Sequence, residues 1–200
     1  MNSLTTTGEN NPREAESAIL VVDMQNDFVM PGAPLCVAGA HATLPAIARF
    51  LNFGRSKGWA VIYICRHHHP SGVDAELFRR HLFQEGRTFC IEGSPGASIP
   101  DEIAPAPGDM TVIKKRFSAF FATGLDLILR RMGVKRIFVT GTQYPNCIRA
   151  TAVDAMSLDY LTTVVTDCCS AATIEVAHAN IRDLRNMGIP CIDSQSIMAR

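Results

Sequence analysis

Short apolar runs alternate with longer segments of helical periodicity along this chain. Residues 18–22 (Ala-Ile-Leu-Val-Val) and 60–64 (Ala-Val-Ile-Tyr-Ile) are apolar throughout, a pattern typical of strands that are buried on both faces of a parallel sheet. Between them, apolar residues from Ala40 to Lys57 recur at approximately helical spacing, and Gly58 follows. This spacing predicts a helix that ends at the glycine.

The same alternation continues to the end of the chain. Further strands are predicted at residues 111–113, 136–140, 161–165 and 189–192, and helices at residues 123–132, 146–156 and 174–187. Asp126 follows Thr123 at the spacing of a capping box, which predicts where the first of these helices begins. Strands that alternate with helices predict a parallel sheet with helices on both faces. The fold class expected is therefore α/β, a three-layer sandwich in one domain.

Composition changes this picture little. Two hundred residues suffice for one domain with a sizeable core. Lys plus Arg and Asp plus Glu number 19 each, so charge gives no reason to expect a nucleic-acid or membrane partner. No apolar run approaches the roughly 18 residues of a membrane span. Residues 1–16 are polar and lack a signal-peptide pattern, which predicts a flexible N-terminal tail.

Cysteine usage bears on the cellular compartment. The seven cysteines include no CxxC pair, and without an export signal we expect reduced thiols and a cytoplasmic protein.

Three chemically distinct side chains follow predicted strands. In sheets of this class ligands bind beyond the carboxyl ends of the strands, where Asp23, Lys114 and the loop 141–147 are expected. Singly, these are as readily a solvated acid, a solvated lysine and a buried apolar cysteine. Together they place a base, a cation and the thiol of Cys147 on one rim, as thiol catalysis requires. Lys115 adjoins Lys114, and strand alternation sends only one of the two into a cleft.

Cys147 has the most favourable position among the cysteines. It follows Asn146, a good N-cap, so we expect it in the first turn of a helix, where the helix dipole lowers the pKa of a thiol. Cys168 and Cys169 follow Asp167 at a predicted strand end and are the rival candidates. The remaining cysteines are expected to be buried apolar residues.

The three predicted strand ends lie in the segments 18–28 (AILVVDMQNDF), 112–120 (VIKKRFSAF) and 141–155 (GTQYPNCIRATAVDA). These segments resemble, in the same order, the motif blocks of the isochorismatase-like cysteine hydrolase family, which includes nicotinamidases and related amidohydrolases. The resemblance implies one domain over residues 17–200 with a six-stranded parallel sheet of order 3-2-1-4-5-6. It also implies a homodimer or homotetramer.

The resemblance further implies a catalytic triad of Asp23, Lys114 and Cys147. The activity expected is cleavage of the C–N bond of a small carboxamide or ureide through a cysteine thioester, with release of ammonia. Nicotinamide, ureidoacrylate and N-carbamoylsarcosine are all possible substrates. Asp23 would take the thiol proton, and Lys114 would stabilise the charges that result.

The loop before Cys147 is expected to bind the oxyanion. Relatives bend it through a cis peptide, which falls here between Thr142 and Gln143, and backbone N–H groups of Thr142, Gln143 and Cys147 would hold the oxyanion. The motif position of Phe28 implies a contact with the substrate. Tyr144, in the third block, is a further candidate for substrate contact.

The histidines after the second strand depart from the family pattern. Some nicotinamidases bind a divalent metal there through an Asp-x-His pair and another histidine, but this chain has His67 in the place of the acid. His67 and His69 would share a face of an extended segment and, with His81, could bind a metal. Because the carboxylate is missing, we expect His67 and His69 to line the substrate pocket, with no metal and no other cofactor.

Two other functions are compatible with the resemblance. One is an isochorismatase-type hydrolase that cleaves a vinyl ether with the Asp alone, although such enzymes need no thiol at the position of Cys147. The other is a catalytically idle relative that serves as a binding or scaffold subunit. Retention of Asp23, Lys114 and Cys147 together favours the amidohydrolase.

Overall fold

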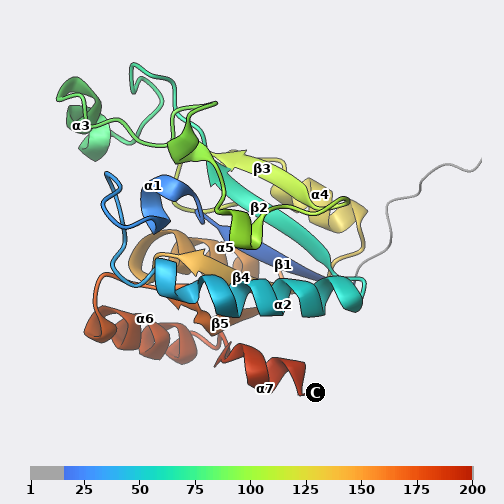
Figure 1. Ribbon diagram of the computed structural model, residues 1–200. Helices are drawn as coiled ribbons and strands as arrows, with labels where there is room; N and C mark the ends of the chain where they lie inside the picture. Colours follow the sequence, from blue (N-terminus) through green and yellow to red (C-terminus); the bar gives the residue numbers. More distant parts are fainter. Residues whose placement is uncertain (1–15, 200) are drawn as a thin grey trace, which may run out of the picture.

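The computed structural model describes residues 16–199 as a single six-stranded parallel sheet between layers of helices (Figure 1). The strand order is β3-β2-β1-β4-β5-β6, so the predicted order is confirmed. The tail expected at residues 1–16 lies outside the described residues except for Glu16. The Glu16 carbonyl accepts hydrogen bonds from the backbone N–H groups of Lys135 and Arg136, which continues the pairing of β1 with β4.

The strands are close to those predicted, with one important extension. Their bounds are β1 Ser17–Val22, β2 Ala60–Arg66, β3 Met110–Lys114, β4 Arg136–Thr142, β5 Leu161–Ser170 and β6 Cys191–Ile192. Every residue of β1 and β2 is buried, because both strands lie inside the sheet with both faces covered. β5 continues to Ser170, so Cys168 and Cys169 are buried strand residues and do not follow a strand end as predicted.

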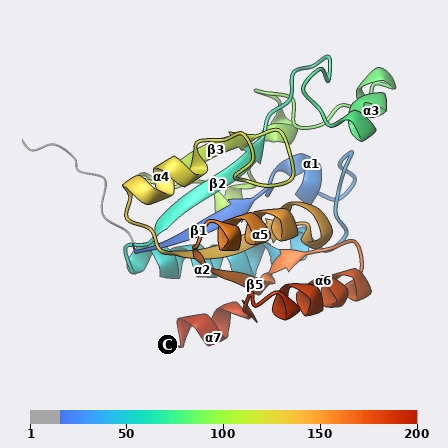
Figure 2. The same ribbon diagram turned by 180° about the vertical axis from the view of Figure 1, so that it is seen from behind.

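The helices fall on two faces of the sheet. Their bounds are α1 Asn26–Val29, α2 Leu44–Ser56, α3 Arg80–Gln84, α4 Leu125–Arg131, α5 Arg149–Ser157, α6 Ile174–Asn186 and α7 Ser194–Met198. Short turns are η1 His41–Thr43, η2 Leu77–Arg79, η3 Pro95–Ala97, η4 Asp101–Ile103 and the π-helical turn η5 Tyr144–Ile148. Helices α2 and α7 pack on one face, and α4, α5 and α6 on the other (Figure 2). No helix among residues 16–199 is long and apolar enough to cross a membrane.

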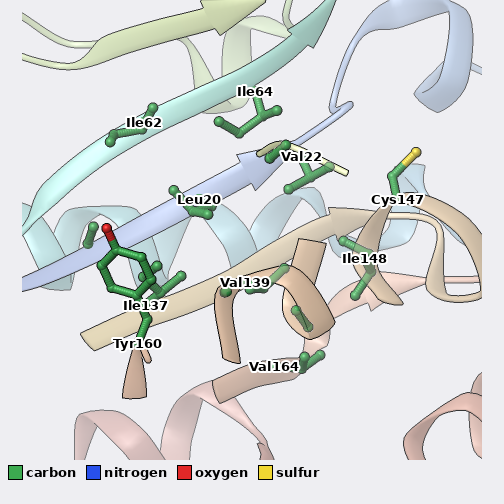
Figure 3. Close-up of a cluster of buried hydrophobic side chains, with 14 of the residues drawn as sticks. Leu20, Val22, Ile62, Ile64, Ile137, Val139, Cys147, Ile148, Tyr160 and Val164 are labelled. Carbon is green, nitrogen blue, oxygen red and sulfur yellow. The ribbon is translucent and has the colours of Figure 1, made fainter. Parts of the chain in front are cut away.

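Alternation along β1 divides the core into two clusters. Leu20 and Val22 face α4 and α5, whereas Ile19 and Val21 face α2. Figure 3 shows the first cluster, which extends to Cys147 at the end of β4. The thiol is therefore anchored to the hydrophobic core on one side.

The start of α4 differs from the prediction. The helix begins at Leu125 with Gly124 as its N-cap, so Thr123 and Asp126 do not form a capping box. The Asp126 carboxylate instead accepts hydrogen bonds from Arg130 Nε at 3.0 Å and from the Tyr160 hydroxyl at 2.8 Å. Asp126 thus joins α4 to the residue that precedes β5.

Candidate active site

The ends of the inner strands bring the three predicted catalytic residues together. Asp23 follows β1, Lys114 ends β3, and Cys147 lies in η5 just after β4. Lys114 Nζ lies 2.7 Å from Asp23 Oδ2 and 3.4 Å from Cys147 Sγ. All three side chains are buried, so a carboxylate, an ammonium and a thiol meet out of contact with bulk water.

Local backbone geometry directs Asp23 into this group. Asp23 has a φ of 53°, a left-handed conformation that is uncommon for residues other than glycine. Its backbone N–H donates to the Ile64 carbonyl at 2.8 Å, which fixes this conformation beside the end of β2. The chain therefore turns away from the sheet after Asp23, while the Asp23 carboxylate contacts Lys114 and Arg66.

The two adjacent lysines point in different directions, as strand alternation requires. Lys114 is buried against Asp23, and its Nζ also donates to the Arg116 carbonyl at 3.1 Å. Lys115 is partly exposed and pairs with Asp74 at 2.7 Å. Of the two lysines, Lys114 is the one that contacts the thiol.

Arg66 is a member of the site that the sequence analysis missed. It ends β2, which lies between β3 and β1, and its side chain is fully buried. Its Nε lies 3.5 Å from Asp23 Oδ2, its Nη2 3.6 Å from Cys147 Sγ and its Nη1 2.7 Å from Glu76 Oε1. The strand-end rule that selected Asp23 and Lys114 applies equally to the second strand and would have found Arg66.

Gln25 holds the end of β2 in place and was also missed. Its side-chain Nε2 donates to the carbonyls of Arg66 and Ala97 at 2.8 Å each, and its Oε1 accepts from the Arg66 backbone N–H at 2.7 Å. Gln25 is fully buried. It therefore ties the segment after β1 to the backbone of Arg66, which orients the guanidinium toward Asp23.

The electrostatics favour an ionised acid beside a neutral thiol. Burial raises the pKa of Asp23, but the charges of Lys114 and Arg66 outweigh it and hold this pKa below its usual range. Burial and the charge of Asp23 raise the pKa of the Cys147 thiol, and Lys114 and Arg66 offset this only in part. Asp23 is thus a base poised next to its proton donor.

The expected N-cap at Asn146 is wrong, and so is the expected lowering of the thiol pKa. Asn146 lies inside the π-helical turn η5, whose N-cap is Gln143. The N–H groups of Asn146 and Ile148 both donate to the Gln143 carbonyl. Pro145, which has no N–H, occupies the first turn in place of the expected cap. Cys147 therefore lies within the turn, where burial dominates its pKa.

The loop before Cys147 has the predicted backbone. The Thr142–Gln143 peptide bond is cis. Gly141 has a φ of 112°, and a Cβ there would collide with the Val22 backbone, so only glycine allows β4 to approach β1 this closely.

A small cavity opens beside the thiol. Its volume is about 20 Å³, and it is lined by Asp23, Phe28, Val37, Arg66, Arg79, Thr142, Gln143, Asn146 and Cys147. The predicted substrate contact Phe28 and the predicted oxyanion residues Thr142, Gln143 and Cys147 are therefore brought to one place. The binding of an oxyanion by their N–H groups stays a prediction.

Three predicted substrate contacts do not line this cavity. Tyr144 is buried in the core, and its hydroxyl donates to the Thr166 carbonyl at 3.3 Å. His69 is exposed, and its Nδ1 lies 2.8 Å from Ser71 Oγ. His67 is half-buried, and its backbone carbonyl accepts a hydrogen bond from Lys115.

His68 is the histidine of this segment that points inward. It is fully buried between the rings of Phe83 and Phe89, with its Nδ1 3.2 Å from Asp74 Oδ1. His81 is exposed. Within residues 16–199, no group of three His, Cys, Asp or Glu side chains is placed to hold a metal ion.

Comparisons with known proteins agree with the fold. The isochorismatase domain model matches residues 17–196. A probable inactive nicotinamidase of Arabidopsis thaliana is 42% identical over 180 residues, covering 88% of this chain and 92% of that protein. Maleamate amidohydrolase of Pseudomonas putida is 32% identical over 168 residues, covering 84% of this chain and 78% of that protein.

A solved structure is more similar still. The crystal structure of an isochorismatase family protein from Desulfovibrio vulgaris superposes with a TM-score of 0.89 at 51% identity, covering 93% of this chain and all of that one (100%). Sequence blocks, sheet order and domain match therefore agree: the chain belongs to the isochorismatase family of hydrolases.

Proposed function

We propose that this protein hydrolyses the C–N bond of a small carboxamide or ureide with Cys147 as the nucleophile. The observation that carries the proposal is the contact of Lys114 Nζ with both Asp23 Oδ2 and Cys147 Sγ, at 2.7 and 3.4 Å. An ionised acid, a fixed cation and a thiol at these distances are the parts that nucleophilic acyl transfer needs.

In the first half of the reaction, Asp23 takes the proton of Cys147 as the sulfur attacks the carbonyl carbon. Asp23 Oδ1 is buried and, among the described residues, has no hydrogen-bond partner, so it has capacity for this proton. The tetrahedral oxyanion lies against backbone N–H groups of the loop from Gln143 to Cys147. A well-placed donor of this kind contributes about 3–4 kcal/mol to the transition state.

In the second half, the leaving nitrogen takes the proton from Asp23 and departs as ammonia. The acyl group is then a thioester on Cys147. Asp23, ionised again, removes a proton from an attacking water, which hydrolyses the thioester and restores the thiol. Lys114 and Arg66 keep the carboxylate ionised between these steps, because their charges lower its pKa.

One observation favours a second candidate function, a catalytically idle binding protein. The Arabidopsis thaliana relative, 42% identical, is described as a probable inactive nicotinamidase. An idle protein would need neither an ionised Asp23 nor a buried Lys114. Burying these charges carries a desolvation penalty, which lowers the stability of the fold, and a catalytic role would explain why the protein keeps them. We therefore favour the enzyme.

Ammonia release from a panel of small amides tests the proposal. The panel contains nicotinamide, maleamate, ureidoacrylate and N-carbamoylsarcosine, assayed with the wild type, Cys147→Ala and Cys168→Ala. Release by the wild type and Cys168→Ala, together with none by Cys147→Ala, supports the proposal. Release that survives in Cys147→Ala, or no release from any amide by the wild type, contradicts it and returns attention to the idle protein.

A further inference from the structure

Arg79 is a half-buried cation that the proposed mechanism does not use. It ends η2 in the segment that, with α3, projects beyond the sheet (Figure 1). Its neighbours Leu77 and Phe78 are 84% and 58% exposed, whereas the Arg79 side chain is only 14% exposed. This turn exposes a leucine and a phenylalanine and covers most of an arginine, whereas apolar side chains are usually buried and arginines exposed. We therefore expect a specific interaction to hold the arginine inside.

Aromatic rings hold the Arg79 guanidinium in place. Its Cζ lies 5.0, 5.5 and 5.6 Å from the ring centroids of Phe78, Phe117 and Phe89. The Phe117 ring also lies 5.7 Å from Arg66 Cζ. Contacts of this kind stabilise a cation but satisfy none of its N–H groups. The rings thus hold the guanidinium in position and leave its N–H groups available to donate hydrogen bonds.

The nearest carboxylate is already engaged by another arginine. Glu76 Oε1 accepts a hydrogen bond from Arg66 Nη1 at 2.7 Å, while Arg79 Nη1 lies 3.6 Å from the same oxygen. Among the described residues, neither this buried Nη1 nor Oε2 of Glu76 has a hydrogen-bond partner, so Arg79 and Glu76 form an ion pair that lacks a hydrogen bond. Leaving a buried charged donor unpaired destabilises the folded protein. An anion bound from outside would supply the missing partner.

The charges around the cavity also leave one cation in excess. Arg66, Lys114 and Arg79 are matched by only two carboxylates, Asp23 and Glu76, and Arg79 lines the same cavity as Cys147. Asp23 Oδ2 contacts Lys114 and Arg66, so it does not neutralise Arg79. A ligand with one negative charge would balance the site, whereas a neutral ligand would leave a buried cation uncompensated.

We propose that the substrate is a compact amide that carries a carboxylate, with this carboxylate bound by Arg79 while the amide carbonyl lies at Cys147. The inference rests on the proposed function. The cavity of about 20 Å³ is close to the space of one water molecule, so a substrate enters by displacing side chains at the rim. A short chain between carboxylate and carbonyl requires the least displacement.

Maleamate and its methyl ester provide a matched test, since they share the amide and differ in the charge. With the wild type, kcat/KM should be about 30-fold or more higher for the acid, as expected for a charge-assisted hydrogen bond. Arg79→Gln should remove most of this difference by raising KM for the acid, and change kcat/KM for the ester less than about threefold. Arg79→Lys should restore part of the preference, and Arg80→Gln, at an exposed neighbour, should leave it intact.

Binding to the Cys147→Ala variant separates this inference from the proposed function. Calorimetry with maleamate and the ester, with and without the additional Arg79→Gln change, reports charge recognition without turnover. Arg79-dependent binding of the acid supports the inference even if no amide is hydrolysed. Equal binding or equal kcat/KM of acid and ester overturns it while hydrolysis stands. An equal loss for both substrates in Arg79→Gln also overturns it, because Arg79 would then have only a structural role.

Discussion

The two ends of the parallel sheet carry very different cavities. At the amino end a groove of about 780 Å³ lies among mainly apolar side chains, including the stacked rings of Trp59 and Phe138, 4.7 Å apart. At the carboxyl end the cavity is about 20 Å³, but it contains Asp23, Arg66 and Cys147. The larger space brings together no carboxylate, cation and thiol, and the smaller one has all three.

This difference follows from the direction of the strands. In a parallel sheet the carboxyl ends of all strands lie at the same end of the sheet, so one residue at each strand end is enough to assemble a site. Here the ends of β1, β2 and β3 contribute Asp23, Arg66 and Lys114. Chemistry therefore depends on which side chains converge, and the volume of a cavity is a poor guide to it.

Replacing Cys147 should cause the largest loss of activity. A small loss would contradict the assignment of the chemistry to the carboxyl end of the sheet. Cys147→Ala should reduce kcat for amide hydrolysis by at least about 10⁴-fold, because among residues 16–199 no other thiol shares the contacts with Lys114 and Arg66. Cys168→Ala is the matched control, since Cys168 is buried in β5. Its activity should stay near that of the wild type. Comparable losses in both variants, measured by ammonia release, would remove the distinction between the two thiols.

Asp23→Asn should separate the loss of turnover from the reactivity of the thiol. Turnover should fall by about 10²- to 10⁴-fold, the usual contribution of a general base. The pKa of Cys147 should also fall, because the variant loses the negative charge that raises it and keeps Lys114 and Arg66. Alkylation of Cys147 by iodoacetamide, followed by mass spectrometry across pH, should therefore have its midpoint at lower pH than in the wild type.

The wild-type pH profile provides the companion measurement. The competent form has Asp23 ionised and Cys147 protonated, and it exists between the lowered pKa of the acid and the raised pKa of the thiol. The acid limb of kcat/KM should therefore fall below the ordinary Asp pKa of 3.8, and the alkaline limb above the ordinary thiol pKa of 9.0. An alkylation midpoint that is unchanged or higher in Asp23→Asn would contradict this coupling.

The two adjacent lysines provide the next largest contrast. Lys114→Ala should reduce kcat/KM by about 100-fold or more, because it removes the cation between Asp23 and Cys147. It should also destabilise the protein by about 3–5 kcal/mol, the usual result of breaking a buried ion pair. Lys115→Ala removes a pair whose lysine side chain is 41% exposed, and activity should change less than about threefold. Equal losses would contradict the assignment of Lys114 to the site.

The sheet, and the meeting of Asp23, Lys114 and Cys147 at one end of it, followed from the sequence because both depend on local patterns. Apolar runs located β1 to β4, and the strand-end rule located Asp23 and Lys114. Alternation also showed that residues two apart share a face, but the prediction placed the wrong pair of residues on the inward face. Arg66 and His68 are the buried pair, and His67 and His69 are not.

Other features of the site depend on contacts that local periodicity does not encode. The chain must leave the sheet after β2 and fold back before Arg79 reaches the cavity. The turn around Cys147 depends on Pro145 and on two N–H groups that share the Gln143 carbonyl. A capping pattern read from Asn146 alone gives the wrong environment for the thiol.

The smallest effect is expected at the amino end, where Leu161 borders the groove and is 61% exposed. Leu161→Glu places a carboxylate in this groove, yet kcat/KM should stay within about twofold of the wild type, since the groove contains no residue of the reaction. Stability should change by only about 0.5 kcal/mol, as is usual for exposed positions. Leu127→Glu, at an equally exposed site on α4 (67%), is the matched control for adding an acid elsewhere. Kinetics and thermal unfolding of both variants measure this. A tenfold loss of kcat/KM specific to Leu161→Glu would show that the two ends of the sheet are coupled, and that the large groove takes part in function after all.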